Sequence, residues 1–187
     1  MTLTPTGYRK RLIDKEFEKN LRTFGAVHVQ GPRNCGKTWS SRNICRSEIQ
    51  LDTDAVQAVK VDRKIALGGE TPHLIDEWQY VPEIWDDVRS ELDRSGEKGR
   101  FILCGSYSLS KEEGKRKLHS GIGRIGSLEM RTMSLYESGD SDGSVSLRGL
   151  FEGDFDAHMT DEIGLKDIIA LIERGGWPSI VGTDAEP

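Results

Sequence analysis

The stretch of sequence that decides the fold is Gly31-Pro32-Arg33-Asn34-Cys35-Gly36-Lys37-Thr38. It fits the pattern G-x-x-x-x-G-K-[ST] of a phosphate-binding P-loop, or Walker A motif. Gly31 and Gly36 permit backbone dihedral angles that other residues avoid, so that consecutive N–H groups converge on phosphate oxygens. Lys37 supplies a positive charge to the β- and γ-phosphates, and the Thr38 hydroxyl is a ligand for Mg²⁺. These residues predict a site for a nucleotide and its magnesium ion.

The residues on either side of this motif support the same interpretation. A β-prone run at 26–30 precedes it, and helix-compatible residues follow it to about Arg46. A P-loop joins a strand to a helix, and the start of that helix adds a favourable partial positive charge for the phosphates. The sequence therefore predicts a strand, a glycine-rich turn and a helix in this order.

A second acidic group for Mg²⁺ is expected at the end of another parallel strand, as in a Walker B motif. The apolar run His73–Ile75 ends at Asp76 and Glu77. We expect Asp76 to hold the metal, directly or through water, and Glu77 to act as the general base for an attacking water. A base beside the metal ligand suits hydrolysis. The alternative is that the two acidic residues only cap a helix after a buried strand.

Two further residues are candidates for catalysis. The apolar run 101–104 (FILC) is typical of a buried strand, and Ser106 follows it. If that strand lies between those ending at Gly31 and Asp76, Ser106 contacts the γ-phosphate or orients the water; otherwise it caps a loop. Arg124 lies in a glycine-rich loop and suits the stabilisation of phosphoryl charge, in cis or from a neighbouring subunit. The alternative for Arg124 is an ordinary surface position.

The remaining pattern predicts an α/β fold of three layers, αβα, with a mainly parallel central sheet. An amphipathic helix is expected before the first strand, with apolar residues at helical spacing from Tyr8 to Phe24. The other expected elements are a strand at 48–51, a helix at 56–67, a helix from Pro82 to Gly96, an extended segment at 128–135 and a helix at 165–172 that stops at Gly175.

Composition limits the class of protein. With 187 residues, 35% hydrophobic and 30% charged, the chain is long enough for one ordinary domain and a short appendage. Because no apolar run approaches about 20 residues and no secretory segment is visible, we expect a cytoplasmic protein without membrane contact. Three cysteines do not suggest a disulfide framework. Residues 137–187 hold 12 acidic and 3 basic side chains, and 137–143 (ESGDSDG) is typical of a loop.

A family resemblance follows from five strings in order: GPRNCGKT, LIDEWQ, FILCGS, HSGIGRI and MSLYESG. The chain resembles, from Tyr8 to about Leu150, prokaryotic ATP-binding proteins with an AAA-type P-loop domain followed by a C-terminal domain of unknown function. The resemblance implies an ASCE-type core with strand order 5-1-4-3-2, ATP and Mg²⁺ as ligands, and Ser106 as a sensor. Cys104 stands where relatives tend to carry Thr, and Thr132 where Pro is usual. We expect neither departure to touch the nucleotide.

These observations predict two parts and rank three functions. Residues 1–150 are expected to form the ATPase domain, and 151–187 an acidic connector and helix leading toward an absent C-terminal domain. The leading hypothesis is Mg²⁺-dependent ATP hydrolysis that drives a conformational switch. A nucleotide-dependent binding module without turnover is the alternative, and a small-molecule kinase ranks lower because no lid-like arginine cluster is visible. A homo-oligomer would supply Arg124 in trans. Basic residues at 111–117 allow nucleic-acid contact, although a solvated loop explains them better because no aromatic residues lie between them.

Overall fold

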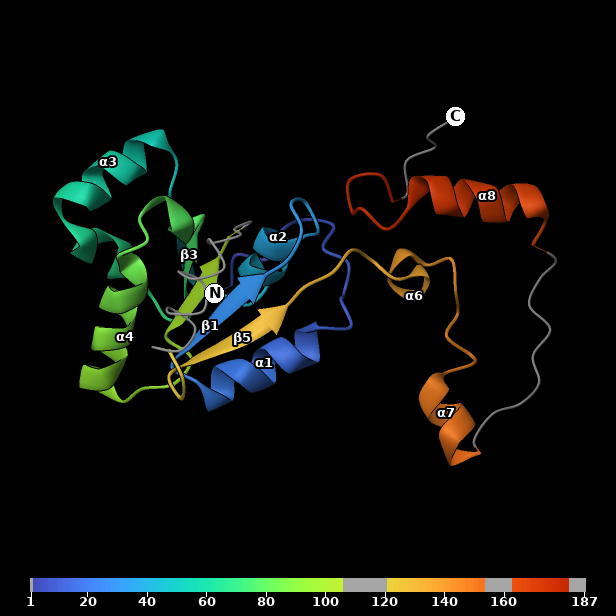
Figure 1. The fold of residues 1–187 in the computed structure, drawn as a ribbon, viewed down its shortest axis with the longest axis horizontal. Helices are drawn as coiled ribbons and strands as arrows, with labels where there is room; N and C mark the ends of the chain where they lie inside the picture. The colour runs from blue at the N-terminus through green and yellow to red at the C-terminus, as the bar shows by residue number, and fades with distance from the viewer. Residues whose placement is uncertain (1, 106–120, 154–162, 182–187) are drawn as a thin grey trace. The chain divides into compact units, whose positions relative to one another are not determined.

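The computed structural model describes residues 2–105, 121–153 and 163–181 (Figure 1). The chain forms two compact units, Met1–Arg131 and Thr132–Pro187. The boundary expected near residue 150 stays a prediction. Ser106 and the basic residues at 111–117 lie outside the described residues.

The first unit is built on a five-stranded parallel sheet in the order β2-β3-β4-β1-β5. The strands are β1 (Ala26–Gln30), β2 (Ser47–Gln50), β3 (His73–Asp76), β4 (Phe101–Cys104) and β5 (Ile125–Glu129). Read in the opposite direction, from β5 to β2, this is the predicted order 5-1-4-3-2. The register pairs Asp76 with Cys104, Cys104 with Val29, and Gln30 with Glu129. The strands therefore bring their carboxyl ends to one edge of the sheet.

Helices cover both faces of this sheet, which confirms the three-layer prediction (Figure 1). One face carries α1 (Asp14–Thr23) and α2 (Lys37–Arg42), and the other carries α3 (Thr53–Val61), the 3₁₀ helices η1 (Arg63–Leu67) and η2 (Trp78–Tyr80), and α4 (Ile84–Ser95). Alternate strand residues enter two separate cores, as the period of two along a strand requires. On β4, for example, Phe101 and Leu103 join the core under α4, and Ile102 joins the one under α1.

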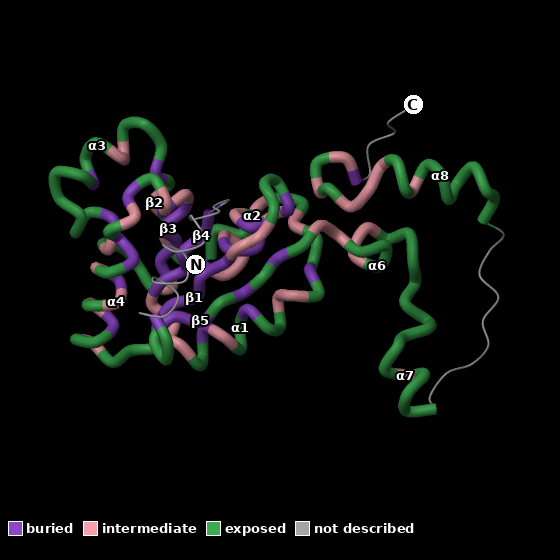
Figure 2. Tube along the Cα trace, viewed as in Figure 1, coloured by how far each residue is buried: buried purple, intermediate pink, exposed green. Residues whose placement is uncertain are grey.

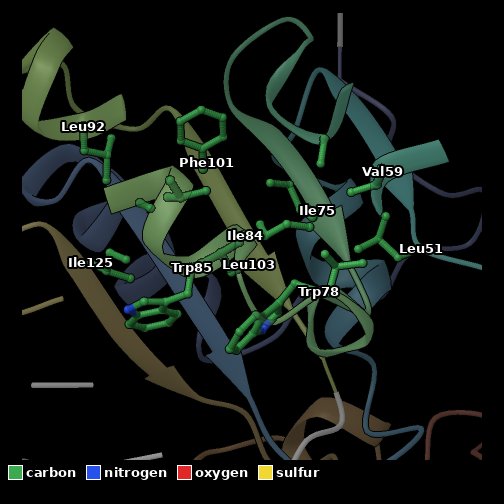
Figure 3. Close-up of a cluster of buried hydrophobic side chains, with 14 residues drawn as sticks. Leu51, Val59, Ile75, Trp78, Ile84, Trp85, Leu92, Phe101, Leu103 and Ile125 are labelled. Carbon is green, nitrogen blue, oxygen red and sulfur yellow. The ribbon is translucent and has the colours of Figure 1, made fainter. Parts of the chain in front are cut away.

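The three central strands, β1, β3 and β4, are the most buried part of the chain, as the tube coloured by exposure shows (Figure 2). In the core under α4, the indole rings of Trp78 and Trp85 lie beside each other with centroids 5.4 Å apart (Figure 3). The side chain of Ile84 belongs to the same cluster. Both tryptophans are therefore packing residues.

The helix before β1 is shorter than predicted. It begins at Asp14 rather than near Tyr8, and only Phe17 and Leu21 of its apolar residues are buried. Polar contacts hold the preceding segment out of the helix. The Tyr8 hydroxyl donates to Asp14 Oδ1 at 2.7 Å and hydrogen-bonds with Ser40 Oγ at 3.0 Å, while the Arg11 backbone N–H donates to Asp14 Oδ2 at 2.9 Å.

Other boundaries differ for local reasons. The predicted helix at 56–67 is divided at Asp62, whose carboxylate accepts a hydrogen bond from the Lys64 backbone N–H and starts η1. The helix after the P-loop ends at Arg42, before the predicted Arg46. The last strand ends at Glu129, whereas an extended segment was expected at 128–135. Residues 137–138, expected in a loop, lie in a short helix that Ser134 caps.

The second unit contains α6 (Leu135–Ser138), α7 (Leu147–Glu152) and α8 (Leu165–Arg174). The α8 helix stops at Gly175, as predicted. The Met133 backbone N–H donates to the Gly176 carbonyl at 2.7 Å, and Arg174 donates to Asp140 Oδ1 at 3.2 Å. Among the described residues of the whole chain, no helix is both long and apolar enough to span a bilayer.

Candidate functional site

The P-loop occupies the turn between β1 and α2, at the edge where the parallel strands end. Gly36 has the left-handed backbone angle φ +104° that the sequence predicted for it. Gly31 is required for a different reason, close approach. A Cβ on Gly31 would lie 2.0 Å from the Met130 carbonyl oxygen, so any side chain would push the loop away from the end of β5.

Lys37 lies under this loop, and the residue is only 5% exposed. Its Nζ donates to the carbonyls of Gly31 at 3.0 Å and Pro32 at 2.7 Å. Within the described part of the chain, no carboxylate forms an ion pair with it. A buried cation held by neutral carbonyls is a favourable partner for an anion such as phosphate.

Thr38 and Asp76 come together from α2 and the end of β3. The Thr38 hydroxyl donates to Asp76 Oδ2 at 3.0 Å, and the Glu77 backbone N–H donates to Asp76 Oδ1 at 3.1 Å. Burial raises the pKa of the Asp76 carboxyl, against hydrogen bonds from Cys104 and Thr38 that lower it. The Cys104 thiol therefore contacts a residue of the candidate site, and its expected lack of contact with the nucleotide stays a prediction. The strand order places Cys104 beside Asp76 in the register, which the sequence alone did not reveal.

Glu77 has a left-handed backbone, with φ 56° and ψ 36°, which is uncommon outside glycine. Its carboxylate accepts a hydrogen bond from Gln79 Nε2 and makes no capping bond to the helix η2 that follows. The Glu77 carboxylate therefore does not cap the following helix, which was the alternative to its role as a base. Gly105 leaves the room that Gln79 occupies, because a Cβ on Gly105 would lie 2.1 Å from Gln79 Oε1.

A family model described as an AAA domain matches residues 23–139, which is more than half of the chain. The chain belongs to this AAA family. The match covers the P-loop, the five strands and the residues Asp76 and Glu77. Membership supports the P-loop as an ATP-binding site and is typical of proteins with ATPase activity in general.

Two curated relatives of this AAA protein are uncharacterized proteins of Mycobacterium bovis and Mycobacterium tuberculosis. Each is 28% identical over 157 residues, covering 78% of this chain and 34% of the relative. The chain thus spans about a third of the length of these relatives. A solved structure of PCH-2 from C. elegans matches with TM-score 0.36 at 15% identity, covering 94% of this chain and 51% of that one.

The other two residues predicted to be catalytic are Ser106 and Arg124, and the structure describes only the second of them. Ser106 lies outside the described residues, but β4, which precedes it, does lie between β1 and β3 as its predicted role requires. Arg124 lies at the opposite edge of the sheet, where its carbonyl accepts from the Gly25 and Ala26 N–H groups at the start of β1. Its guanidinium forms an ion pair with Asp93 and the side chain is 44% exposed. Within one chain, Arg124 and the P-loop are therefore apart.

Two residues that contact the site, Gln79 and Arg11, are not predicted by the sequence patterns. Gln79 lies two positions after Glu77. A polar side chain so close to the acidic pair could have been recognised in the sequence as a possible contact. Arg11 gave no such signal. Its guanidinium donates from Nη1 to the carbonyl of Cys35, inside the P-loop, at 2.9 Å, although 24 residues separate the two along the chain.

Proposed function

We propose that this AAA domain binds ATP with Mg²⁺ at the P-loop and hydrolyses it, in a cycle that drives a conformational switch. The observation that carries the proposal is the contact between Thr38 Oγ1 and Asp76 Oδ2, 3.0 Å apart. Two neighbouring ligands of an octahedral ion with bonds of about 2.1 Å lie about 3.0 Å apart. The separation of these two oxygens, which come from different elements, is therefore compatible with both holding one Mg²⁺.

The donor set also suits this metal. Mg²⁺ prefers oxygen ligands and usually keeps several waters, binding through one or two protein groups and the phosphates of a nucleotide. Thr38 and Asp76 are such groups. When bound, the ion neutralises charge on the β- and γ-phosphates. Lys37 would exchange its carbonyl partners, Gly31 and Pro32, for phosphate oxygens.

Glu77 is the proposed general base. A water attacks the γ-phosphorus and gives one proton to the Glu77 carboxylate as the new phosphorus–oxygen bond forms. The bond to the β,γ-bridging oxygen breaks, and ADP leaves with the electron pair. The hydrogen bond from Gln79 supports this role, because it holds the carboxylate in one orientation.

Ser106 and Arg124 complete the proposed machinery. The place of β4 between β1 and β3 supports Ser106 as a sensor of the γ-phosphate. Arg124 would act on the site of a neighbouring copy, and its exposure supports this role. An ion pair as exposed as that of Arg124 with Asp93 is worth about 0–1 kcal/mol, so Arg124 is easily released toward another partner. The chain covers only a third of the length of its relatives. We therefore keep two statements as predictions: that the switch acts on a partner, and that the protein is cytoplasmic.

The test compares the wild-type chain with Glu77→Gln, Lys37→Ala and the control Glu83→Gln, which removes an exposed carboxylate six positions after Glu77. We expect wild type and Glu83→Gln to bind and hydrolyse Mg–ATP. Glu77→Gln should bind ATP but hydrolyse it about 100-fold or more slowly, the usual contribution of a general base. Lys37→Ala should not bind. Calorimetry measures binding, and phosphate release measures turnover, across a protein-concentration series that also reports assembly.

A mixing experiment tests Arg124. Lys37→Ala lacks its own site but retains Arg124, whereas Arg124→Gln has the reverse defect. If the arginine acts between copies, mixing the two inactive variants in equal amounts should restore about a quarter of the wild-type rate. Half of the sites are intact, and half of those adjoin an intact arginine. No recovery at any concentration would refute the role in trans.

Two outcomes would change the proposal. Wild-type turnover by Glu77→Gln would show that Glu77 is not the base. ATP binding by the wild-type chain without turnover, even at high protein concentration, would instead favour a nucleotide-dependent binding module. The position of Arg124 at the far edge of its own sheet gives that second function its support, because a single copy lacks the arginine at its site.

A further inference from the structure

Arg11 is a buried cation outside every motif of the P-loop fold. It lies before α1 and is only 7% exposed. Its Nη1 donates to the Cys35 carbonyl at 2.9 Å, and its Nη2 donates to the Arg131 carbonyl at 2.8 Å. One planar guanidinium thus joins the middle of the P-loop to the chain just after β5.

The Cys35 carbonyl belongs to the peptide that carries the Gly36 N–H group. In a trans peptide, the C=O and N–H bonds point in opposite directions. A donor that fixes the carbonyl on one side of the loop therefore aims the Gly36 N–H at the other side. Because the donor is charged, the bond is stronger than one between neutral groups, and it polarises the peptide so that its N–H becomes a better donor.

Other contacts fix the same part of the loop to β5. The Cys35 thiol donates to the Met130 carbonyl at 3.6 Å, and Gly31 lies too close to that carbonyl to carry a side chain. Arg11 is itself held in place, since Asp14 accepts its backbone N–H, and Tyr8 in turn binds Asp14. The loop is therefore held in its conformation by residues on both of its sides.

We propose that Arg11 is a positioning residue for nucleotide binding, which orients the Cys35–Gly36 peptide so that its N–H group binds phosphate. The inference rests on the proposed function, because it assigns Arg11 to the phosphate site of that ATPase. The two carbonyls that Arg11 binds belong to residues on different segments, and the fork of a guanidinium reaches both. A lysine has the charge without the fork.

The experiment uses Arg11→Met and Arg11→Lys in the full chain, with Arg100→Met as the control. Arg100 is also largely buried and forms ion pairs with Glu91 at 3.0 Å and Glu97 at 3.2 Å, but it precedes β4 at the edge opposite the P-loop. We expect Arg11→Met to lose about tenfold or more in affinity for both Mg–ATP and Mg–ADP, the usual effect of losing a charged hydrogen bond. Arg11→Lys should lie between Arg11→Met and wild type, and Arg100→Met should bind as wild type does.

A spectroscopic measurement separates positioning from a general loss of structure. Cysteine precedes glycine at only two places in the sequence, Cys35–Gly36 and Cys104–Gly105. Labelling cysteine carbonyls with ¹³C and glycine amides with ¹⁵N therefore gives two NMR signals in a carbonyl-selected spectrum, and Cys104→Ala assigns them by removing one. In wild type, Mg–ADP should move the Gly36 amide proton downfield, as a new hydrogen bond to phosphate requires. In Arg11→Met at saturating Mg–ADP, this movement should be reduced.

Wild-type affinity of Arg11→Met for both nucleotides, or an unchanged Gly36 movement, would overturn the inference. Full affinity in Arg11→Lys would overturn it too, because charge alone would then suffice. Loss of affinity in Arg100→Met equal to that in Arg11→Met would show a merely structural effect. If wild type bound neither nucleotide, the proposed function itself would fail, and the inference with it. If wild type binds and only the Arg11 variants lose affinity, both stand.

Discussion

The burial of His28 makes the folding stability of the unit that contains the P-loop depend on pH. His28 lies in the middle of β1 and is 8% exposed, with its ring edge-on to Trp78 and Trp85 at centroid distances of 5.5 and 5.4 Å. Its Nδ1 is buried and has no hydrogen-bond partner among the described residues. Burial lowers the pKa of His28 to about 4. The folded protein therefore keeps this ring neutral well below neutral pH.

The sign follows from proton binding. In the unfolded chain, the imidazole has a pKa of about 6.5 and takes up a proton below it, whereas the folded chain takes up none until about pH 4. The unfolded state therefore binds more protons between these values, so that stability is fully present above the unfolded pKa and falls as the pH falls toward 4. Between pH 7 and pH 5, the loss that His28 causes is about 2 kcal/mol.

The assay is urea unfolding of the wild type and of His28→Phe at pH 7 and pH 5. Phenylalanine retains an aromatic ring between the two tryptophans but has no proton to bind. Other groups also titrate: burial lowers the pKa of His73 and raises that of Asp76. Both proteins contain them, so the difference between the two pH dependences isolates His28. A difference below about 0.5 kcal/mol would refute the buried, neutral ring.

Two further predictions concern the P-loop. Gly31→Ala should cost about 2 kcal/mol or more of stability and abolish nucleotide binding, because its Cβ would lie 2.0 Å from the Met130 carbonyl oxygen. Gly96→Ala, where a Cβ meets nothing within 4 Å but the backbone φ is +66°, should lose about 1 kcal/mol of stability from backbone strain and leave binding intact, and calorimetry with urea unfolding compares the two. Lys37→Met should raise the stability of the nucleotide-free protein by about 1 kcal/mol, since it removes a buried charge that has no carboxylate partner among the described residues. The same variant should lose the increase in Tm that Mg–ATP gives the wild type, and a less stable variant would contradict this account.

The sequence predicted the elements whose physical causes are local. The P-loop depends on glycines and a lysine at fixed spacing, and buried strands such as β4 consist of continuous apolar residues that no helix period explains. The place of Asp76 beside Thr38 was predictable, because an acidic residue at the end of a buried parallel strand lies at the same edge of the sheet as the P-loop. The sheet order came from the family resemblance, and the strand register confirms it.

Two of the features that the sequence did not predict depended on distant contacts. Apolar spacing suggested a helix from Tyr8, but Tyr8 binds Ser40, 32 positions later, and Leu12 is 61% exposed. Arg11 was missed for the same reason, because its second carbonyl partner is 120 positions away. No pattern within a short window encodes such a pair. The short helix after Ser134 was different, since Ser134 and Glu137 form a capping box that was readable from the sequence.

The position of Arg124 restricts how copies of this domain can assemble if that residue acts in trans. Its carbonyl binds the Gly25 N–H at the start of β1, and the P-loop begins six residues later at Gly31. At about 3.3 Å per residue, the two edges of the sheet lie roughly 20 Å apart. The edge that carries Arg124 in one copy must then face the opposite edge, with its P-loop, in the next. If each interface makes this contact once, the interface is heterologous and closes into a ring or continues as a filament, whereas a symmetric dimer must make the contact twice across one patch that contains both edges.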